Sequence, residues 1–450
     1  MIKVRKIIFP KELFKDLLEF LSGKEPHETG CFLLAHNYTT KDYGIVLTII
    51  DVIKPKSDSW NYEDEHGLSP KSSFINQSVL MADANNSSLI FVHTHPNALH
   101  PPKFSLIDEE TNRKLLPNLS EILQNRPLGS LVLSKLGMYG VILYKGRMEE
   151  VTDIRIVGTT YHQFPVTNDK RKPRPISSTF DRQVRAIGTD VQSRLQDACV
   201  SVVGVGGTGS AVAVQLARMG VKKLLLVDRD IVDESNVTRM YGSTHKDVGK
   251  PKVQTLKKHL LSFSKTKVET LCVDIAKTDV VSMLTDSDVM FSCTDNLTSR
   301  SILNDIAVQY YIPLIDVGCR IDLNGSHSIN QAIVKVQVVT PDGACLWCTG
   351  ALDGKAILQE SFSDEEKKKL INEGYYESLE KQPSIVTLTS LAASIAVNKF
   401  LSLLNVFGDQ YASRVQVEVR DEFMVSDSPA IKADCICRKR RGLGNTRRIL

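Results

Sequence analysis

The stretch Ser201–Gly220, SVVGVGGTGSAVAVQLARMG, is the strongest indication of the fold in the longer part of this chain. It has the pattern of an apolar strand, a glycine-rich turn and a helix. Gly204 and Gly206 allow a tight turn and a close approach of the backbone, and Gly207 belongs to the same loop. Gly209 opens a helix whose N-terminus favours phosphate. The stretch therefore predicts a nucleotide-binding unit.

Strand and helix patterns alternate outward from this stretch. ACVSVVGV, KKLLLVD and VETLCVDI are short apolar runs, and SAVAVQLARMG and PKVQTLKKHLLSF between them are typical of helices. Such alternation predicts a mostly parallel sheet with helices on its faces. We therefore expect an α/β domain with a Rossmann-like sheet.

Polar and charged residues follow the predicted strands. Asp228 ends the strand after the glycine loop, where a carboxylate can accept hydrogen bonds from a ribose. ESNVTRM contains Asn236 and Arg239, VGKPK contains Lys252, and SCTDN contains Asp295. Basic residues stabilise a triphosphate and an aspartate holds the Mg²⁺ that bridges it, so the set suits adenylation. A nicotinamide-dependent oxidoreductase has no need for this set and remains the alternative.

Upstream, FDRQVRAIG places Arg182 before the first strand. Together these motifs resemble the ThiF-type adenylyltransferases, which ubiquitin-activating enzymes share with the thiamine and molybdopterin pathways, over about Thr179 to Lys439. The resemblance implies ATP and Mg²⁺, a ubiquitin-like protein as substrate and a homodimer in which Arg182 reaches the partner's nucleotide. The implied roles are Asp228 on the ribose, Asn236, Arg239 and Lys252 on the phosphates, and Asp295 on Mg²⁺.

A second motif, FVHTHPNALHPPKFSLIDEE, lies in the first part of the chain. His93 and His95 are two apart on an extended segment, so both side chains point to one side of it. Asp108 could close a zinc site, and Ser105 is placed to donate a hydrogen bond to a developing oxyanion. Glu28, in HETGCFLLAH, is the candidate base. The alternative is two ordinary strand-end histidines and a helix cap at Asp108.

HETG, HTHP and SLID, taken in order, resemble the JAMM (MPN-type, JAB) metalloprotease signature. The resemblance implies Zn²⁺ on the two histidines and Asp108, Glu28 as general base, and cleavage after the C-terminal glycine of a ubiquitin-like protein. Zinc lowers the pKa of bound water to about 7, and a carboxylate can take the remaining proton. Nine residues separate His95 from Ser105, more than the family usually has, so the loop carries an insertion.

Four of the nine cysteines form two pairs near the C-terminus. GACLWCTG contains Cys345 and Cys348, and ADCICRK contains Cys435 and Cys437. Two such pairs predict a structural zinc site with four cysteine ligands, and free buried thiols are the alternative. ThiF-type proteins usually have C-x-x-C in both places, so we expect the C-x-C pair to strain simultaneous ligation.

A thioester cysteine is missing from its usual place after the first pair, because residues 349–434 contain no cysteine. Cys319, in PLIDVGCRID, is the remaining candidate nucleophile, against the alternative of a small buried residue. Direct transfer of the adenylate to the thiol of a conjugating-enzyme-like partner would need no cysteine of this chain.

The stretch Tyr161–Ser178 is polar, basic and proline-rich, which predicts a linker. It separates an expected JAMM/MPN-type α/β domain at residues 1–160 from an expected ThiF-type domain at residues 179–450. A length of 450 residues suits two or three domains.

Composition and charge bear on nucleic-acid binding, secretion and membrane insertion. A net charge of +4 gives no reason to expect nucleic-acid binding, and the N-terminus mixes Lys, Asp and Glu into its apolar residues, unlike a signal peptide. SLAASIAVNKFLSLLNVF contains Asn398 and Lys399, so we expect a buried helix and no membrane span. These features favour a cytoplasmic protein.

The two halves suggest one substrate class. We expect a bifunctional enzyme that processes or deconjugates a ubiquitin-like protein at its C-terminal glycine and adenylates the same C-terminus, in a bacterial pathway such as antiphage defence. The alternatives are the processing of a sulfur-carrier protein in biosynthesis, a scaffold with an inactive first domain, and an NAD-dependent oxidoreductase.

Overall fold

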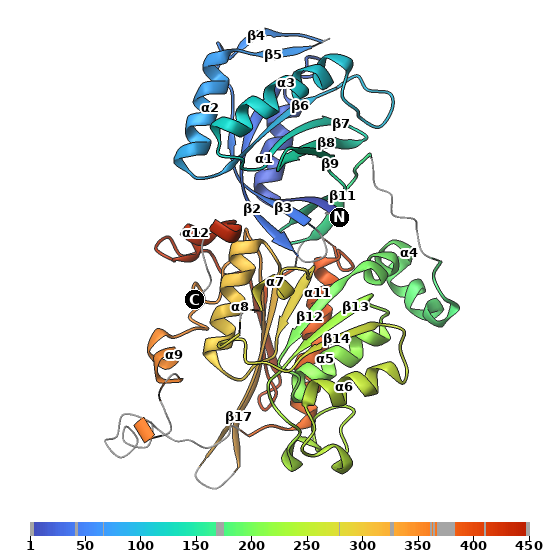
Figure 1. Cartoon of the computed structure of the whole chain (residues 1–450). Coiled ribbons are helices and arrows are strands. Elements are labelled where there is room, and N and C mark those ends of the chain that lie inside the picture. Colours follow the sequence, from blue (N-terminus) through green and yellow to red (C-terminus); the bar gives the residue numbers. More distant parts are fainter. Residues whose placement is uncertain are drawn as a thin grey trace. The chain divides into compact units, whose positions relative to one another are not determined.

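The structure is a computed structural model that describes residues 4–40, 44–65, 67–167, 175–278, 280–324, 328–360, 362, 365–366, 383–408 and 411–446. The chain forms two compact units (Figure 1). The first unit comprises Met1–Lys172 with Gln309–Tyr311 and Arg440–Arg448, and the second comprises Pro173–Val308, Ile312–Lys439 and Ile449–Leu450.

The first unit is built on a mixed sheet with the strand order β11-β10-β1-β3-β2-β6-β7-β8-β9. The strands are β1 (Val4–Pro10), β2 (Gly30–Thr40), β3 (Gly44–Ile53), β6 (Ser88–Thr94), β7 (Leu128–Ser134), β8 (Gly137–Tyr144), β9 (Arg147–Glu150), β10 (Asp153–Val157) and β11 (Tyr161–Phe164). β4 (Trp60–Glu63) and β5 (Leu68–Pro70) form a separate pair. The helices are α1 (Lys11–Ser22), α2 (Ser72–Ala84) and α3 (Leu106–Ile122).

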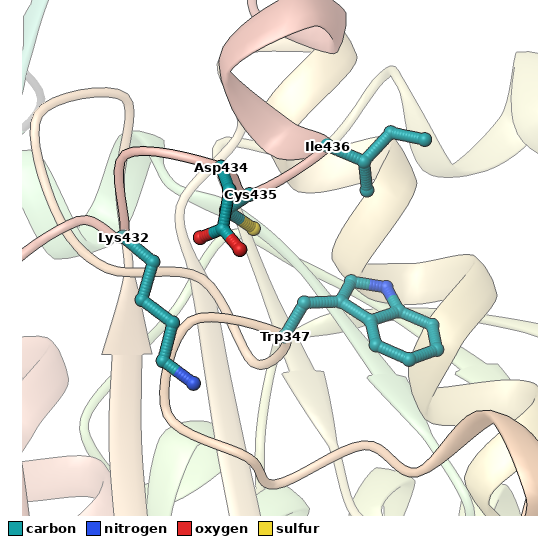
Figure 2. A pocket seen from close by; sticks show the side chains of 5 residues that line it. All are labelled: Trp347, Lys432, Asp434, Cys435 and Ile436. Atoms are coloured by element: carbon teal, nitrogen blue, oxygen red, sulfur yellow. The ribbon is translucent and has the colours of Figure 1, made fainter.

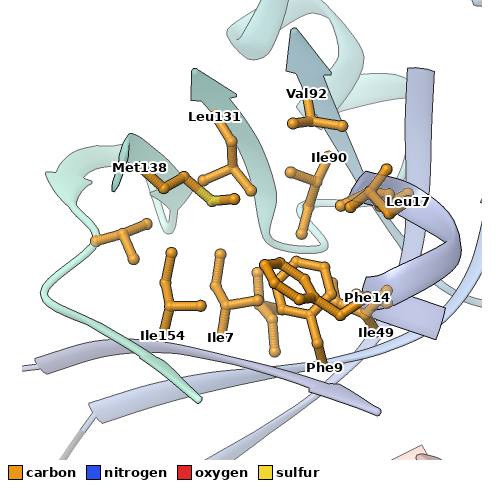
Figure 3. Close-up of a cluster of buried hydrophobic side chains, with 14 of the residues drawn as sticks. Ile7, Phe9, Phe14, Leu17, Ile49, Ile90, Val92, Leu131, Met138 and Ile154 are labelled. Atoms are coloured by element: carbon orange, nitrogen blue, oxygen red, sulfur yellow. The ribbon is translucent and has the colours of Figure 1, made fainter. Parts of the chain in front are cut away.

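The core of the first unit follows from the two-residue period of its strands. In β6, Ile90 and Val92 join the cluster that packs with α1, whereas Leu89 and Phe91 join the cluster that packs with α2 and α3. Figure 3 shows the α1 side, where Ile90 and Val92 lie in the same cluster as Leu17 of α1. Because both faces of the sheet are covered, β6 is fixed in register as it reaches His93.

The second unit contains the Rossmann-like sheet. Its strands are β12 (Cys199–Val203), β13 (Lys223–Val227), β14 (Lys267–Leu271), β15 (Val289–Ser292), β16 (Leu314–Leu323), β17 (Ile329–Val339), β18 (Arg414–Glu418) and β19 (Phe423–Asp427). Its α-helices are α4 (Asp181–Asp197), α5 (Gly207–Arg218), α6 (Lys252–Leu261), α7 (Val281–Leu284), α8 (Leu297–Tyr310), α9 (Gly354–Glu360), α11 (Val386–Leu403) and α12 (Cys437–Arg440). Short 3₁₀ helices occupy Ser178–Phe180, Glu234–Asn236, His245–Asp247 and, in the chain's last described segment, Gly444–Thr446.

The strand order of this sheet is β14-β13-β12-β15-β16-β17-β18-β19. The pairs from β14 to β16 are parallel and those from β16 to β19 are antiparallel. Figure 1 shows α8 on one side of the sheet and α5 and α6 on the other. The order in which successive strands are added to the sheet reverses between the parallel strands β12 and β15, and such sheets bind ligands at this point. The predicted α/β class and the mostly parallel sheet are confirmed.

The apolar stretch near the C-terminus forms α11. By length and composition α11 could cross a membrane, but the core helix of a globular protein passes the same test. α11 packs on α5, β16 and β17, and most of its length is buried. Lys399 within it donates a hydrogen bond to the carbonyl of Ala412.

The unit boundaries differ from the predicted ones at two places. The predicted linker begins at Tyr161, but Tyr161–Phe164 form β11, which pairs antiparallel with β10 and buries Tyr161. Residues 168–174 of the linker lie outside the described residues. Arg440–Arg448, predicted to belong to the second domain, group with the first unit, where the Gly442 carbonyl accepts a hydrogen bond from Thr48 Oγ1 at 2.7 Å.

Candidate functional site

The glycine loop connects β12 to α5 at the carboxyl edge of the parallel strands. Gly204 has a φ of +83°, and a Cβ there would lie 2.6 Å from the Cys293 carbonyl oxygen. A Cβ at Gly209 would lie 1.8 Å from the Gly204 carbonyl oxygen, whereas one at Gly206 would meet nothing within 4 Å. Backbone packing therefore requires glycine at two of these positions, and Gly206 leaves open space above the loop. Such a loop at a helix N-terminus suits a phosphate.

Asp228 directly follows β13 and holds this loop. Its Oδ2 accepts a hydrogen bond from Val205 N and its Oδ1 accepts one from Asp230 N, both at 2.8 Å. Burial raises the pKa of Asp228, while the two backbone donors and nearby Lys252 act in the opposite direction. Lys252 itself donates to Asp230 Oδ2 at 2.8 Å. The carboxylate and the lysine thus lie together beside the glycine loop.

Arg239 and Asn236 lie next to the start of α5. A Cβ on Gly207 would be 3.3 Å from Arg239 Cγ, so the arginine stem crosses the N-terminus of α5. Arg239 Nη1 donates to the Ser235 carbonyl at 2.7 Å. Asn236 is buried, and its Oδ1 accepts from Asp233 N at 3.1 Å, which closes a capping box. The structure therefore brings Arg239 to the loop and gives Asn236 a role in local structure.

Asp295 and Arg182 are exposed. Asp295 lies in the loop between β15 and α8, and this loop contacts Gly204 through Cys293. Arg182 lies in the first turn of α4, where no described residue of the glycine loop hydrogen-bonds to it. The structure thus places Asp295 at the predicted edge, whereas Arg182 has no described contact that joins it to this edge.

Two features at this edge escaped the sequence analysis. Glu360, the last residue of α9, accepts hydrogen bonds from Leu297 N at 2.7 Å and Thr298 N at 2.8 Å at the start of α8. Arg300, in the next turn, pairs with the buried carboxylate of Asp316. Both contacts join segments distant in sequence, so no local motif could have indicated them.

Cys319 lies on β16 beside the glycine loop. Its Sγ is 3.9 Å from Thr208 Oγ1 of α5 and 3.9 Å from the Leu388 carbonyl oxygen. Burial raises the pKa of this thiol to about 11, although the contact with Thr208 lowers it. A thiol is a weak nucleophile when protonated, so this environment does not activate Cys319.

The four paired cysteines form one cluster in the second unit. Sγ–Sγ distances are 3.8 Å for Cys345–Cys348, 3.7 Å for Cys345–Cys435 and 3.7 Å for Cys348–Cys437. Zn–S bonds of about 2.3 Å place the sulfurs of a tetrahedral site about 3.8 Å apart. The cluster thus suggests a structural zinc site, and the expectation that C-x-C would strain it is corrected, because the turn after Cys435 brings both sulfurs in.

Cys435 is the least buried ligand of this cluster. It lines a pocket of about 250 Å³ together with Trp347, Lys432, Asp434 and Ile436 (Figure 2). The indole of Trp347 comes from the first cysteine pair and the other lining residues come from the segment around the second. Cys435 is the one member of the cluster that lines the pocket, and the other three cysteines of the cluster are buried.

The histidine motif converges in the first unit. His93 Nε2 lies 3.3 Å from Asp108 Oδ1, His95 Nε2 lies 3.4 Å from Asp108 Oδ2, and His95 Nε2 lies 3.7 Å from Glu28 Oε1. One ligand atom from each histidine and from Asp108 falls within 4.8 Å of the others. The end of β6 and the start of α3 thus bring His93, His95 and Asp108 together, and Glu28 reaches them from the segment before β2.

Ser105 and Asp108 form the N-terminal capping box of α3. Asp108 N donates to Ser105 Oγ at 3.1 Å, and both Ser105 N and Ser105 Oγ donate to Asp108 Oδ2 at 2.8 Å. The hydroxyl has one proton to donate, and Asp108 receives it. The predicted role of Ser105 as an oxyanion donor is therefore not supplied by this arrangement, in which Ser105 orients the carboxylate.

Glu28 is brought to the histidines by close strand packing. It precedes β2, and a Cβ on Gly30 would lie 2.7 Å from the Val92 carbonyl oxygen and 3.2 Å from His93 Cβ. Burial raises the pKa of Glu28, although the neighbouring imidazoles lower it. Burial alone would raise the pKa of Asp108, but the imidazoles and the Ser105 hydroxyl hold it well below its usual range.

The environment of the His93 side chain indicates whether a zinc ion suits this cluster. Its side chain is 3% exposed, and among the described residues neither ring nitrogen has a partner with hydrogen-bond geometry. A buried imidazole without hydrogen bonds is costly and demands an explanation. Two imidazoles and a carboxylate at this spacing match the nitrogen and oxygen ligands that zinc takes in catalytic sites.

Comparison with known proteins identifies the second unit. Residues 180–437 match the sequence profile of the ThiF family. The SAMP-activating enzyme E1 of Haloferax volcanii is 31% identical over 167 residues, which cover 36% of this chain and 57% of that protein. The sulfur carrier protein ThiS adenylyltransferase of Bacillus subtilis is 32% identical over 165 residues, which cover 36% of this chain and 46% of that protein.

The chain therefore spans about half the length of these curated relatives. Among solved structures, E. coli MccB is similar with a TM-score of 0.46 and 21% identity, over 61% of this chain and 74% of that one.

Proposed function

The chain belongs to the ThiF family, and from this membership we propose that its second unit uses ATP to adenylate the C-terminal carboxylate of a ubiquitin-like or sulfur-carrier protein. The observation that carries the proposal is the glycine loop, which Asp228 holds through Val205 N with Lys252 nearby, and beside which the Arg239 stem crosses the start of α5. The relatives are named for activating or adenylating small carrier proteins.

The proposed reaction follows from these charges. A carboxylate oxygen of the substrate forms a bond to the α-phosphorus of ATP, and the bond from that phosphorus to the bridging oxygen breaks, so pyrophosphate leaves. Lys252 and Arg239 would offset the phosphate charge, and Asp228 would accept hydrogen bonds from the ribose. Asn236, buried in its capping box, would support the turn that carries Arg239. Asp295 would hold Mg²⁺, an ion usually bound by one or two carboxylates together with substrate phosphates.

Arg182 would act across a homodimer. It is exposed in the first turn of α4 and makes no hydrogen bond to the described residues of the glycine loop in its own chain. An arginine supplied from a partner subunit would complete the charge around the phosphates, which is why we keep the dimer as part of the proposal.

For the first unit we propose a zinc-dependent peptidase of JAMM type. The observation that carries it is the buried imidazole of His93, which lies 3.3 Å from Asp108 Oδ1 and makes no contact of hydrogen-bond geometry with the described residues, beside His95 and Glu28. Zinc held by these three ligands would supply a water of lowered pKa. Glu28 would accept the proton and pass it to the leaving amine, and burial suits this role because it raises the pKa of the acceptor.

One substrate can visit both units. A peptidase that cuts after a C-terminal glycine yields the free carboxylate that an adenylating enzyme consumes, so the product of the first reaction is the substrate of the second. Because the Cys319 thiol is not activated, the adenylate would pass directly to the thiol of a conjugating-enzyme-like partner or to a sulfur donor. The name of the Bacillus relative favours the sulfur-carrier version.

The test is a pair of substitutions with opposite expected results. Asp295→Ala should abolish ATP–pyrophosphate exchange and spare cleavage of C-terminally extended glycine-ended proteins, whereas Glu28→Ala should do the reverse. Glu65→Ala, an exposed acid near Glu28, and Glu422→Ala, an exposed acid of the second unit, are the matched controls. Loss of both activities in either variant would contradict the two-site division, and a wild-type chain without zinc or exchange activity would refute the proposal.

A further inference from the structure

The N-terminus of α8 lies at the same edge as the glycine loop. The connection Cys293–Asn296 leaves β15 and contacts Gly204, and α8 begins at the next residue. The first backbone N–H groups of a helix have no acceptor inside the helix, and they attract anions. The group that accepts hydrogen bonds from the start of α8 therefore lies close to the edge of the sheet that carries the glycine loop.

That acceptor is the carboxylate of Glu360. Its Oε1 accepts from Leu297 N at 2.7 Å, and its Oε2 accepts from Thr298 N at 2.8 Å and from Thr298 Oγ1 at 2.7 Å. Asn296 Oδ1 accepts from Ser299 N at 2.8 Å. The first turn of α8 is thus clamped by a residue 62 positions from Thr298, at the end of a helix that follows the first cysteine pair.

The charge on Glu360 is balanced from α8. Arg300 Nε donates to the buried Asp316 at 2.9 Å, and the same guanidinium lies close enough to Glu360 to interact with it. Burial alone would lower the pKa of Arg300, but Asp316 and then Glu360 raise it. The clamp is therefore a charged, directed contact.

The side chain of Asp295, in contrast, is not held by any described residue. It is exposed, and it forms neither a hydrogen bond nor an ion pair with any residue that the structure describes. Its direction is therefore set by the backbone between β15 and α8, which is held at one end by the sheet and at the other by Glu360 and Asn296.

We propose that Glu360 is a positioning residue for adenylation: it fixes the start of α8 and so holds the loop that presents Asp295 to the magnesium of the bound nucleotide. The inference rests on the proposed function of the second unit. Groups that orient metal ligands typically change metal affinity about 10- to 100-fold when removed. Removal of the Glu360 carboxylate should therefore lower the affinity for the metal, and it should slow the reaction much less when the metal is saturating.

The experiment uses Mn²⁺ as a probe and measures its affinity for this site. Mn²⁺ binding to the full chain with a non-hydrolysable ATP analogue is followed by electron paramagnetic resonance, and we expect Glu360→Ala to weaken it about tenfold. In ATP–pyrophosphate exchange the same variant should need about tenfold more Mg²⁺ for half its maximal rate, with a near wild-type rate at saturating Mg²⁺. Glu360→Asp should restore part of the affinity.

Glu422→Ala is the matched control, because it removes an exposed acid of the same unit and should leave both curves unchanged. If Glu360→Ala does not fold, Glu360→Gln, which keeps the size of the side chain and one oxygen acceptor, is measured instead with the same expected direction. A lower melting temperature with unchanged Mn²⁺ affinity would overturn the proposal and leave Glu360 a structural cap. A wild-type chain without exchange activity would instead refute the proposed function.

Discussion

At the scale of single residues, Asp108 combines two functions in one carboxylate. Its Oδ1 faces His93, while its Oδ2 lies by His95 and also accepts two hydrogen bonds from Ser105. The helix cap and the candidate metal site therefore share an oxygen atom. Because the capping box fixes the rotamer of Asp108, ligand geometry depends on a serine that need not touch the metal.

We expect Ser105→Ala to weaken zinc binding in the first unit about tenfold, because the carboxylate loses a hydrogen bond that orients it. Loss of the cap should also lower the free energy of unfolding by about 1 kcal/mol. Competition with a zinc chelator and chemical denaturation measure the two effects. Ser105→Thr keeps the hydroxyl and is the control, and equal zinc affinity in all three proteins would contradict the orienting role.

Cys319 illustrates how burial controls reactivity. With a pKa of about 11, only about one thiol in a thousand is ionised at pH 8. We expect Cys319 to react with iodoacetamide far more slowly than the exposed Cys272, and its rate to keep rising with pH up to about 11. Mass spectrometry of the two peptides after timed alkylation measures this, and fast labelling of Cys319 at neutral pH would revive it as a nucleophile.

At the scale of elements, the turn from β12 into α5 depends on two different uses of glycine. Gly204 is needed because its backbone is left-handed and touches the Cys293 carbonyl, whereas Gly206 has an ordinary φ and open space around it. The first glycine serves the fold of the loop, and the second leaves room for a ligand.

This difference predicts different phenotypes for two alanine substitutions. Gly204→Ala should lower the melting temperature without nucleotide, because the added Cβ would be 2.6 Å from a backbone oxygen at a strained φ. Gly206→Ala should leave the melting temperature of the free protein near that of the wild type and weaken ATP binding, because its Cβ would occupy the space above the loop. Calorimetry with and without ATP separates the two, and equal destabilisation of the free protein would contradict the assignment.

At the scale of the whole molecule, the described residues include two clusters of candidate metal ligands with different chemistry, one in each unit. The four sulfurs are spaced for a closed structural site, whereas the two imidazoles and the carboxylate leave a coordination position for water. The second unit relies on its cluster because it joins segments separated by 90 residues, from Cys345 to Cys435.

We expect the purified chain to hold two zinc ions, one for each cluster. His93→Ala should remove one ion with little change in the stability of the second unit. Cys345→Ser should remove the other and lower the unfolding temperature of the second unit, because metal binding is part of its folding free energy. Elemental analysis and calorimetry check this with Cys272→Ser as the control, and a full zinc content in either variant would contradict the ligand assignment.

Much of the organisation was predictable because it depends on neighbours in the sequence. The glycine loop, the alternation of strands and helices, the H-x-H pair and the cysteine pairs all act over a few residues, so spacing sufficed to predict them. Tyr161–Phe164 was predicted to begin the linker because the segment is polar, but it forms β11, since a short edge strand needs only one buried face. The sequence suggests Ser105 as a hydrogen-bond donor to an oxyanion, because a sequence does not show which acceptor a hydroxyl group faces.

Patterns of neighbouring residues were enough to predict the α/β class and to nominate the candidate residues of each site. Four features became visible from the three-dimensional packing: the C-x-C pair completes the sulfur cluster, Ser105 orients Asp108, Cys319 is buried, and Glu360 binds the start of α8. The physical reason is common to most of them: they depend on distances between atoms whose residues lie far apart along the chain, and packing sets those distances.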